Sequence, residues 1–195
     1  MRVPETLLHL SQRLAYDGSE LRPHFLRTKF GLKGDGVAIF RGPCHVDDQL
    51  VDLEDREKGA FIHSRDMLHL IAELFQVDLP SMVLLQRLTA SLIADRVRAS
   101  LDPMSPSVVR RGDDVYVGNG KLTVSIATVS PVSALMHFGI NIDTRDTPVE
   151  TSGLAPLGID EQEFAEGLLS DLQAEIRAII GAACKVRPVF EGPRP

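Results

Sequence analysis

Two alternating segments near the middle of the chain constrain its fold most. From Leu122 to Ala127 apolar and polar side chains alternate, and the same period returns from Leu135 to Ile142. A period of two is typical of a β-strand with one buried face and one outward face. Pro131, which has no backbone N–H, lies between the segments and suits a turn. The pattern therefore predicts an antiparallel hairpin.

The register of this hairpin follows from the position of its turn. A turn centred near Pro131 puts the polar sides of the two strands on one face of the sheet. The pairs expected on that face are Ser125 with His137, Thr123 with Gly139, and Lys121 with Asn141. A glycine inside a strand often marks the close approach of a ligand. The pairing predicts a binding face, and an ordinary solvated sheet face is the alternative.

Charged residues gather just before Lys121. A short strand is expected at 115–117, and the segment Gly118-Asn119-Gly120 predicts a tight turn that leaves Lys121 at the start of its own strand. Guanidinium groups bind phosphate through two hydrogen bonds, a lysine adds a mobile positive charge, and carboxylates hold magnesium. The groups of these types before the turn are Arg110, Arg111, Asp113 and Asp114. The cluster predicts a phosphate-handling site, and an exposed group of ion pairs is the alternative.

These residues also carry a resemblance to a known superfamily. The segments GDDVYV, GKLTVSIAT and HFGINI resemble the core of the biotin and lipoate protein ligases. The chain is identified as a member of an uncharacterised branch, a domain of unknown function that shares the blocks YDGSELRPHF, FRGPCHV, VDLED and KLTVSIAT. The resemblance implies an α+β fold, like that of class II aminoacyl-tRNA synthetases. Its sheet would be mixed and mainly antiparallel, with helices packed on one face.

The resemblance also implies roles for individual residues. The strand lysine of the ligases, which contacts the carboxyl and phosphate groups of the acyl-adenylate, matches Lys121. The aspartate of the preceding strand matches Asp113 or Asp114, either of which would hold magnesium. The Arg/Gly-rich loop of the ligases matches the segment of Arg41 and Gly42, which lacks the full run of glycines and arginines. The implied cofactors are ATP and Mg.

The resemblance suggests a function and its alternatives. A small carboxylic acid would be bound and activated with ATP, and the acyl group would then pass to an acceptor protein. A thioester-forming transferase is disfavoured because the loop at 151–158 contains no cysteine. A non-catalytic module that binds a small molecule or nucleotide in the same groove is the main alternative. A carboxylate-based hydrolase using Asp52, Glu54 and Asp55 ranks last.

Composition sets the broad class of protein. A chain of 195 residues suits one domain, 1–195, and a net charge of −6 argues against a nucleic-acid partner. Two cysteines, Cys44 and Cys184, form neither a disulfide framework nor a zinc motif, and there is no apolar run of membrane-spanning length. We therefore expect a cytoplasmic protein with no membrane partner. Exposed strand edges would permit a homodimer.

The rest of the chain is assigned by pattern. A short helix or irregular arm is expected at 4–14, and a buried strand at 37–40 that ends in the loop RGPCHVDD. Helical spacing predicts helices at 67–75, capped by Ser64, at 81–101, and at 160–180, where Asp160 and Glu163 form a capping box. Residues 143–159 are expected to form a flap over the polar face. An edge strand is predicted at 185–190.

Overall fold

The central element of the protein is a five-stranded sheet. The computed structural model describes residues 2–145, 147, 149–187 and 189. The strand order is β1-β2-β3-β8-β7, with β1 parallel to β2 and every other pair antiparallel. The strands are β1 (Glu5–Arg13), β2 (Gly36–Val46), β3 (Ile62–Phe75), β7 (Thr123–Val129) and β8 (Ser133–Asn141). A mixed, mainly antiparallel sheet confirms the predicted α+β class.

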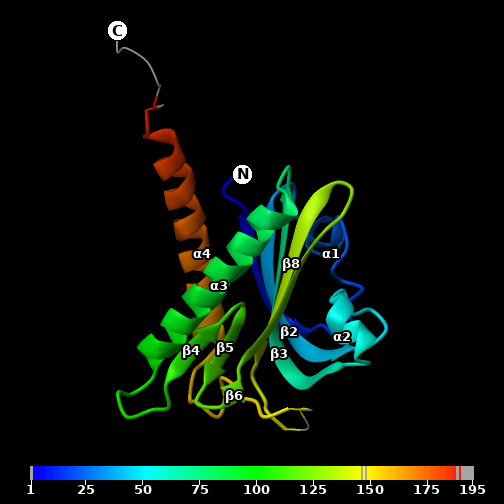
Figure 1. The fold of residues 1–195 in the computed structure, drawn as a ribbon, viewed down its shortest axis with the longest axis vertical. Helices are drawn as coiled ribbons and strands as arrows, with labels where there is room; N and C mark the ends of the chain where they lie inside the picture. The colour runs from blue at the N-terminus through cyan, green and yellow to red at the C-terminus, as the bar shows by residue number, and fades with distance from the viewer. Residues whose placement is uncertain (1, 146, 148, 188, 190–195) are drawn as a thin grey trace.

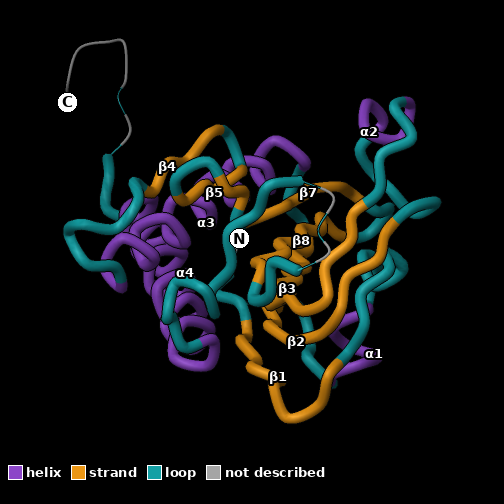
Figure 2. The backbone as a smooth tube through the Cα atoms, turned by 90° about the horizontal axis from the view of Figure 1, so that it is seen from below, coloured by secondary structure: helices purple, strands orange, loops and turns teal. Residues whose placement is uncertain are grey.

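Two long helices cover one face of this sheet. They are α3 (Leu79–Ser100) and α4 (Glu161–Cys184), and they lie together on one side of the strands (Figure 1). A small sheet of β4 (Val108–Arg111), β5 (Asp114–Val117) and β6 (Gly120–Lys121) lies beside α3. The short helices α1 (Phe25–Phe30) and α2 (Leu53–Glu57) flank the opposite face, at the edge of the view in Figure 2. The predicted helix layer is confirmed, and a thinner second layer covers the other face.

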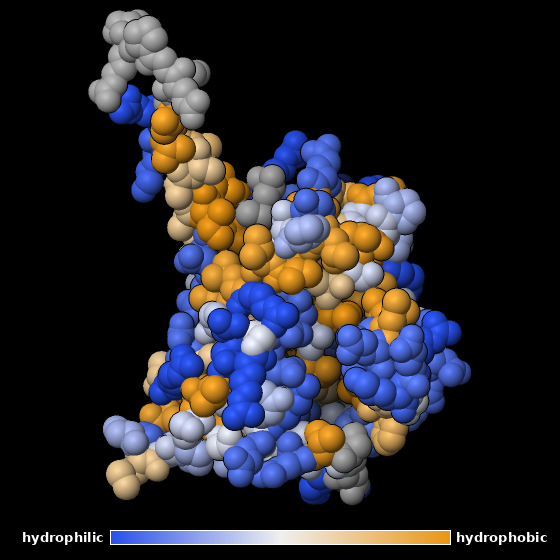
Figure 3. Space-filling model, viewed as in Figure 1, coloured by the Kyte–Doolittle hydropathy of each residue, from blue (hydrophilic) through white to orange (hydrophobic). Residues whose placement is uncertain are grey.

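Local signals in the sequence account for the ends of both long helices. The Asp160 carboxylate accepts a hydrogen bond from the backbone N–H of Glu163, as predicted for a cap at that position. Asp78 caps α3 in the same way, and Pro80 stands in its first turn, where a missing N–H costs nothing. Beyond Ile176, the last buried residue of α4, the helix projects from the body, and Figure 3 shows hydrophobic residues along it.

Four secondary-structure predictions were wrong, the last of them as far as the described residues go. Residues 67–75 belong to strand β3, because a central strand buried on both faces loses its alternation and resembles a buried helix. Residues 5–13 form strand β1 and pair with β2, so they are neither a helix nor an irregular arm. Strand β2 continues through the predicted loop as far as Val46. Of the predicted edge strand, residues 185–187 and 189 form no strand, and the other two lie outside the described residues.

The hairpin of β7 and β8 forms as predicted, but its register differs by one residue. Ser125 lies opposite Phe138, and Val124 lies opposite Gly139. Ser130 and Ser133 close the turn, which is therefore centred between Pro131 and Val132. The polar side of β7 consequently faces α3, on the other side of the sheet from His137.

No helix within the described part of the chain is long and apolar enough to cross a membrane.

Candidate functional site

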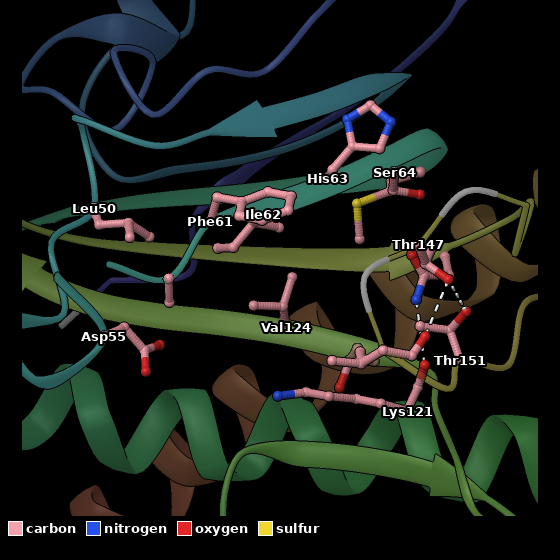
Figure 4. A pocket seen from close by; sticks show the side chains of 15 residues that line it. Leu50, Asp55, Phe61, Ile62, His63, Ser64, Lys121, Val124, Thr147 and Thr151 are labelled. Carbon is pink, nitrogen blue, oxygen red and sulfur yellow. Dashed lines mark hydrogen bonds between the residues drawn. The ribbon is translucent and has the colours of Figure 1, made fainter. Parts of the chain in front are cut away.

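A pocket of about 210 Å³ lies on the face of the sheet that α3 and α4 leave uncovered (Figure 4). The sheet supplies its floor, the 47–61 segment supplies one wall and the 143–151 segment the other. Its apolar lining is Leu50, Ala60, Phe61, Ile62, Met67, Val124 and Val149. Its polar lining is Asp55, His63, Ser64, Lys121, Thr123, Asn141, Thr147 and Thr151. Although eight of the fifteen lining residues are polar, most of the exposed lining surface is apolar, which is typical of a small-molecule site.

Backbone and side-chain bonds hold Lys121 at this pocket. Its N–H donates to the carbonyl of Glu150, and its own carbonyl accepts from the N–H of Ser152, which ties β6 to the 143–151 segment. The Asn141 amide also donates to the Lys121 carbonyl, over 3.3 Å. The Lys121 side chain runs below Val124 in the view of Figure 4. These bonds fix the strand from which the lysine projects.

Among the described residues, the Lys121 ammonium has one ion-pair partner. Its Nζ lies 2.8 Å from a carboxylate oxygen of Asp114, on the adjoining strand β5. Burial raises the pKa of Asp114, against the opposing pull of Lys121. Desolvation therefore disfavours the charged form of Asp114, which pairs with Lys121 in this structure. An anionic ligand in the pocket would compete with Asp114 for the Lys121 ammonium, and burial already disfavours the Asp114 carboxylate.

A smaller pocket of about 60 Å³ adjoins the first and shares four of its lining residues, Leu50, Asp55, Ile62 and Val124. Its floor is aromatic. The rings of Tyr16 and His137 stack with their centroids 3.8 Å apart, and His69 lies beside them. The two pockets therefore lie next to each other on this face of the sheet, and together they are called the groove below.

His69 and His137 form a buried hydrogen-bonded pair. Nδ1 of His69 lies 3.1 Å from Nε2 of His137, and Nε2 of His69 lies 3.2 Å from the carbonyl oxygen of Gly42. Burial lowers the pKa of His69 to about 4, and it lowers that of His137 well below the ordinary value. Both rings are therefore neutral at pH 7.

This pair predicts an acid-sensitive fold. Because His69 binds a proton more readily in the unfolded chain, the free energy of unfolding should fall as pH drops from 7 to 5. The expected loss from His69 alone is about 2 kcal/mol. Urea unfolding at both pH values measures it. The double variant His69→Gln/His137→Gln should lose this pH dependence, and an unchanged slope in that variant would contradict the assignment.

The structure brings some of the predicted site residues together. Lys121, Thr123 and Asn141 line the larger pocket, while Ser125 and His137 line the smaller one. Thr123 and Ser125 use their hydroxyls elsewhere, on the N–H of Val115 and on Asp113. Gly139 lines neither pocket, but an added Cβ would come within 2.6 Å of Met67 and 3.1 Å of Val124, which line the larger one. A side chain at that position would displace these two residues.

The predicted arginines do not converge on the pocket. Arg41 lies on the opposite face of the sheet, where it pairs with Asp66 at 2.7 Å and with Glu161 of α4. Arg111 lies over the ring of Tyr116, and Arg110 donates to the carbonyl of Gly112. Asp113 pairs with Arg87 at 2.8 Å. The expected phosphate-handling cluster is thus distributed over separate structural contacts.

The contacts of Asp113 predict a purely structural role. Its carboxylate accepts hydrogen bonds from Arg87, from the buried Gln86 and from Ser125, all within 2.9 Å. Asp113→Ala should lower the free energy of unfolding by about 2 kcal/mol, because Gln86 and Ser125 lose their shared acceptor. Ligand binding should be unchanged. The control Asp95→Ala removes an exposed carboxylate and should have little effect, and equal losses in both variants would contradict this role.

Sequence reasoning passed over much of the groove. It considered the acidic segment at 51–59 only for the hydrolase hypothesis, whereas Leu50, Asp55 and Phe61, in and beside this segment, line the larger pocket. The Asp52 carboxylate caps α2, and Glu54 lies 3.8 Å from Lys58, so the three acids of the hydrolase hypothesis do not face one another as a set. No group of three metal-ligating side chains occurs among the described residues. His69 lies in the buried strand β3, where no alternation marked it.

Comparisons place the chain among known proteins. A family model described as a domain of unknown function, DUF366, matches residues 6–187. An uncharacterised protein of Methanocaldococcus jannaschii is 34% identical over 163 residues, which are 80% of this chain and 72% of that protein. A structure of a protein of unknown function from Pyrococcus horikoshi is 38% identical, with a TM-score of 0.88 over 95% of this chain and 99% of that chain.

Ligases share the fold at low identity. A biotin protein ligase from Aquifex aeolicus, solved in complex with biotin and ATP, is 13% identical with a TM-score of 0.56, over 89% of this chain and 70% of that chain. A structure described as a putative lipoate protein ligase from T. acidophilum is also 13% identical, with a TM-score of 0.53 over 88% and 85% of the two chains. The predicted resemblance in fold is confirmed.

Proposed function

This chain belongs to the DUF366 family, and we propose that its groove binds a small carboxylic acid with an extended apolar body. The single observation that carries the proposal is the position of Lys121 on the wall of a largely apolar pocket. Among the described residues of that lining, it is the one Lys or Arg. Burial of the apolar body would supply most of the affinity, and pairing of the carboxylate with the ammonium would orient the ligand.

Activation of the acid with ATP is the second candidate, which the ligase fold favours. The described residues fit a triphosphate poorly, because Arg41, Arg110 and Arg111 face elsewhere and Asp113 and Asp114 are already paired. Lys121 is left as the one strong cation at the pocket for the phosphates and the carboxylate together. The geometry therefore supports acid binding further than acid activation or transfer to an acceptor protein. A non-catalytic binding module fits these observations.

Calorimetric titration tests the proposal. Octanoate, lipoate and biotin would each be titrated into the protein, with methyl octanoate as the matched ligand without a carboxylate. We expect saturable binding of at least one acid, and octanoate should bind more tightly than its ester. Equal affinity for octanoate and methyl octanoate would contradict the proposed role of Lys121.

A parallel assay separates binding from activation. The protein would be incubated with ATP, Mg²⁺ and each acid, and pyrophosphate release would be measured. Acid binding without acid-dependent pyrophosphate is the expected result. Acid-dependent release would instead establish the ligase activity that the fold suggests.

A further inference from the structure

We infer that a second copy of this chain docks on the face of the sheet that carries α1 and α2, with the α1 segment of each copy against the α2 segment of the other. The inference goes beyond the proposed acid binding and does not depend on it. It follows from the charges of the two segments, from their places on one face, and from exposed apolar side chains near α2.

The two segments carry opposite net charges. The basic segment, residues 22–33, contains α1 and has four Lys or Arg residues and no Asp or Glu. The acidic segment, residues 47–58, contains α2 and has six Asp or Glu residues and two Lys or Arg residues. With histidine neutral, their net charges are therefore +4 and −4. The whole chain carries −6, so the basic segment differs in sign from the rest of the molecule.

The two sets of charges do not neutralise each other within one chain. Arg27, Lys29 and Lys33 are exposed, and among the described residues none of their side-chain nitrogens lies within 4.0 Å of a carboxylate oxygen. Asp48 and Glu57 of the acidic segment are also exposed, and no ion pair involves them in the part of the chain that the structure describes. Each segment therefore keeps its charge available for another molecule.

The two segments lie toward opposite ends of one face. Both short helices pack over the cluster of buried residues that includes Phe25, Phe40 and Leu50. Figures 1 and 2 show α1 and α2 on the same side of the sheet, and Figure 2 shows them at opposite ends of that side. A two-fold axis between them would bring each segment onto the oppositely charged segment of a second copy. The face is therefore complementary to itself, which favours a second copy as its occupant.

Exposed apolar side chains lie in and beside the acidic segment. Leu53 is 68% exposed and Phe61 is 51% exposed. The aliphatic stems of Arg27 and Lys29 from a second copy would cover this apolar surface, and a guanidinium over the Phe61 ring would add a cation–π contact. Charge would set the orientation of the two copies, and burial of the apolar groups would add affinity.

The two edges of the five-stranded sheet are less suitable for a second copy. In β1 the pairing with β2 shifts register between His9 and Arg13, and an irregularity of this kind turns an edge away from a further strand. At the other edge, α3 and β5 already make hydrogen bonds to Ser125 and Thr123 of β7. The homodimer expected from strand edges is therefore better formed through the α1 and α2 face.

Two charge-reversed variants test the inference by sedimentation velocity. Arg27→Glu/Lys29→Glu changes the basic segment and Asp48→Lys/Glu57→Lys changes the acidic one, and all four side chains are exposed. The wild-type protein should be a dimer at low salt. It should dissociate more readily in about 1 M NaCl, where the Debye length is about 3 Å. Each variant alone should form a dimer about 100-fold weaker, because the two-fold axis repeats each substitution in a second contact.

Mixing the two variants is the decisive step. In a mixed dimer one contact keeps both wild-type segments and the other pairs two reversed segments, so an equimolar mixture should associate again. Restored association also shows that both variants are folded. Arg177→Glu/Lys185→Glu makes the same change in net charge at the projecting end of α4, and this control should dimerise as the wild type does.

Four results would overturn the inference. The first is a wild-type protein that stays monomeric at low salt, and the second is a dimer that resists both charge reversals. The third is a mixture of the two variants that remains dissociated. The fourth is an equal loss of association in the α4 control, which would show an effect of net charge alone.

Discussion

Replacing Lys121 with methionine is expected to weaken octanoate binding by about 30-fold. Methionine keeps an unbranched apolar side chain of similar length and removes the ammonium, which we propose as the partner of the ligand carboxylate. A hydrogen bond to a charged group contributes about 2 kcal/mol, which corresponds to this change in affinity. Calorimetric titration of both proteins with octanoate and with methyl octanoate measures the effect. The ester should bind equally to both proteins.

The partner of Lys121 requires a matched control. In Lys121→Met the Asp114 carboxylate loses the ammonium that lies 2.8 Å away, so the variant changes both the ligand site and the local fold. The double variant Lys121→Met/Asp114→Asn removes both charges and should bind octanoate as weakly as the single variant. Asp114→Asn alone releases the lysine and should bind octanoate at least as tightly as the wild type. Binding by Lys121→Met within two-fold of the wild type would contradict the site assignment.

Gly42→Ala is expected to lower the free energy of unfolding by about 3 kcal/mol. An added Cβ would lie 2.0 Å from the carbonyl oxygen of Leu14 and 2.6 Å from its carbonyl carbon. These are backbone atoms, and the N–H of Leu14 is itself bonded to the carbonyl of Arg41, so the chain cannot yield locally. Overpacking of this kind typically costs about 1–3 kcal/mol, and rigid backbone neighbours put Gly42 at the upper end. Urea unfolding of the wild type and the variant measures the loss.

A second glycine is the control for this substitution. Gly181 lies near the end of α4, and a Cβ there would meet no atom within 4 Å. Gly181→Ala should raise the free energy of unfolding by up to about 1 kcal/mol, because alanine favours the helix. The two variants should therefore differ in sign. A loss below about 1 kcal/mol in Gly42→Ala would show that strand β1 moves away more easily than its hydrogen bonds suggest.

Gly42 shows that a residue of a functional motif can be required for a structural reason. The resemblance to ligases assigns Gly42 to a nucleotide-binding loop, but the residue lies within strand β2, where the end of β1 passes too closely for any side chain. Its carbonyl also accepts the hydrogen bond that orients His69 and, through it, His137. A change at Gly42 would therefore affect the smaller pocket as well as the stability of the sheet.

The hairpin shows how far alternation can be used. The two apolar/polar patterns correctly predict strands β7 and β8 and the turn between them, because each strand has a single period of two. The register depends on whether the turn is centred at Pro131 or half a residue later, which periodicity cannot distinguish. This shift of the turn by half a residue points the Ser125 side chain toward α3. There the Ser125 hydroxyl accepts a hydrogen bond from Gln86 and donates one to Asp113.

Strand β3 marks the opposite limit. Its residues from Asp66 to Leu74 are buried on both faces, so the sequence shows no alternation, and the apolar residues follow a helical spacing instead. Its identity as a strand depends on β2 and β8 on either side, which are distant in the sequence. Strand β8 is buried as completely, but its polar residues His137 and Asn141 lie on one side of the strand and keep the alternation visible.

By itself, the sequence predicted the two long helices, the Asp160 cap and the hairpin, which depend on neighbours within a few positions. Its resemblance to ligases predicted the α+β class and Lys121 as the residue to test. Only the tertiary structure decided which charges meet. It placed Arg41 behind the sheet, paired Asp113 with Arg87, and joined Gly42, His69 and His137 below the groove. Those contacts join residues that are 25 to 120 positions apart in the sequence. Strand pairing and side-chain packing bring these residues together, and a pattern of neighbouring residues carries no information about such pairings.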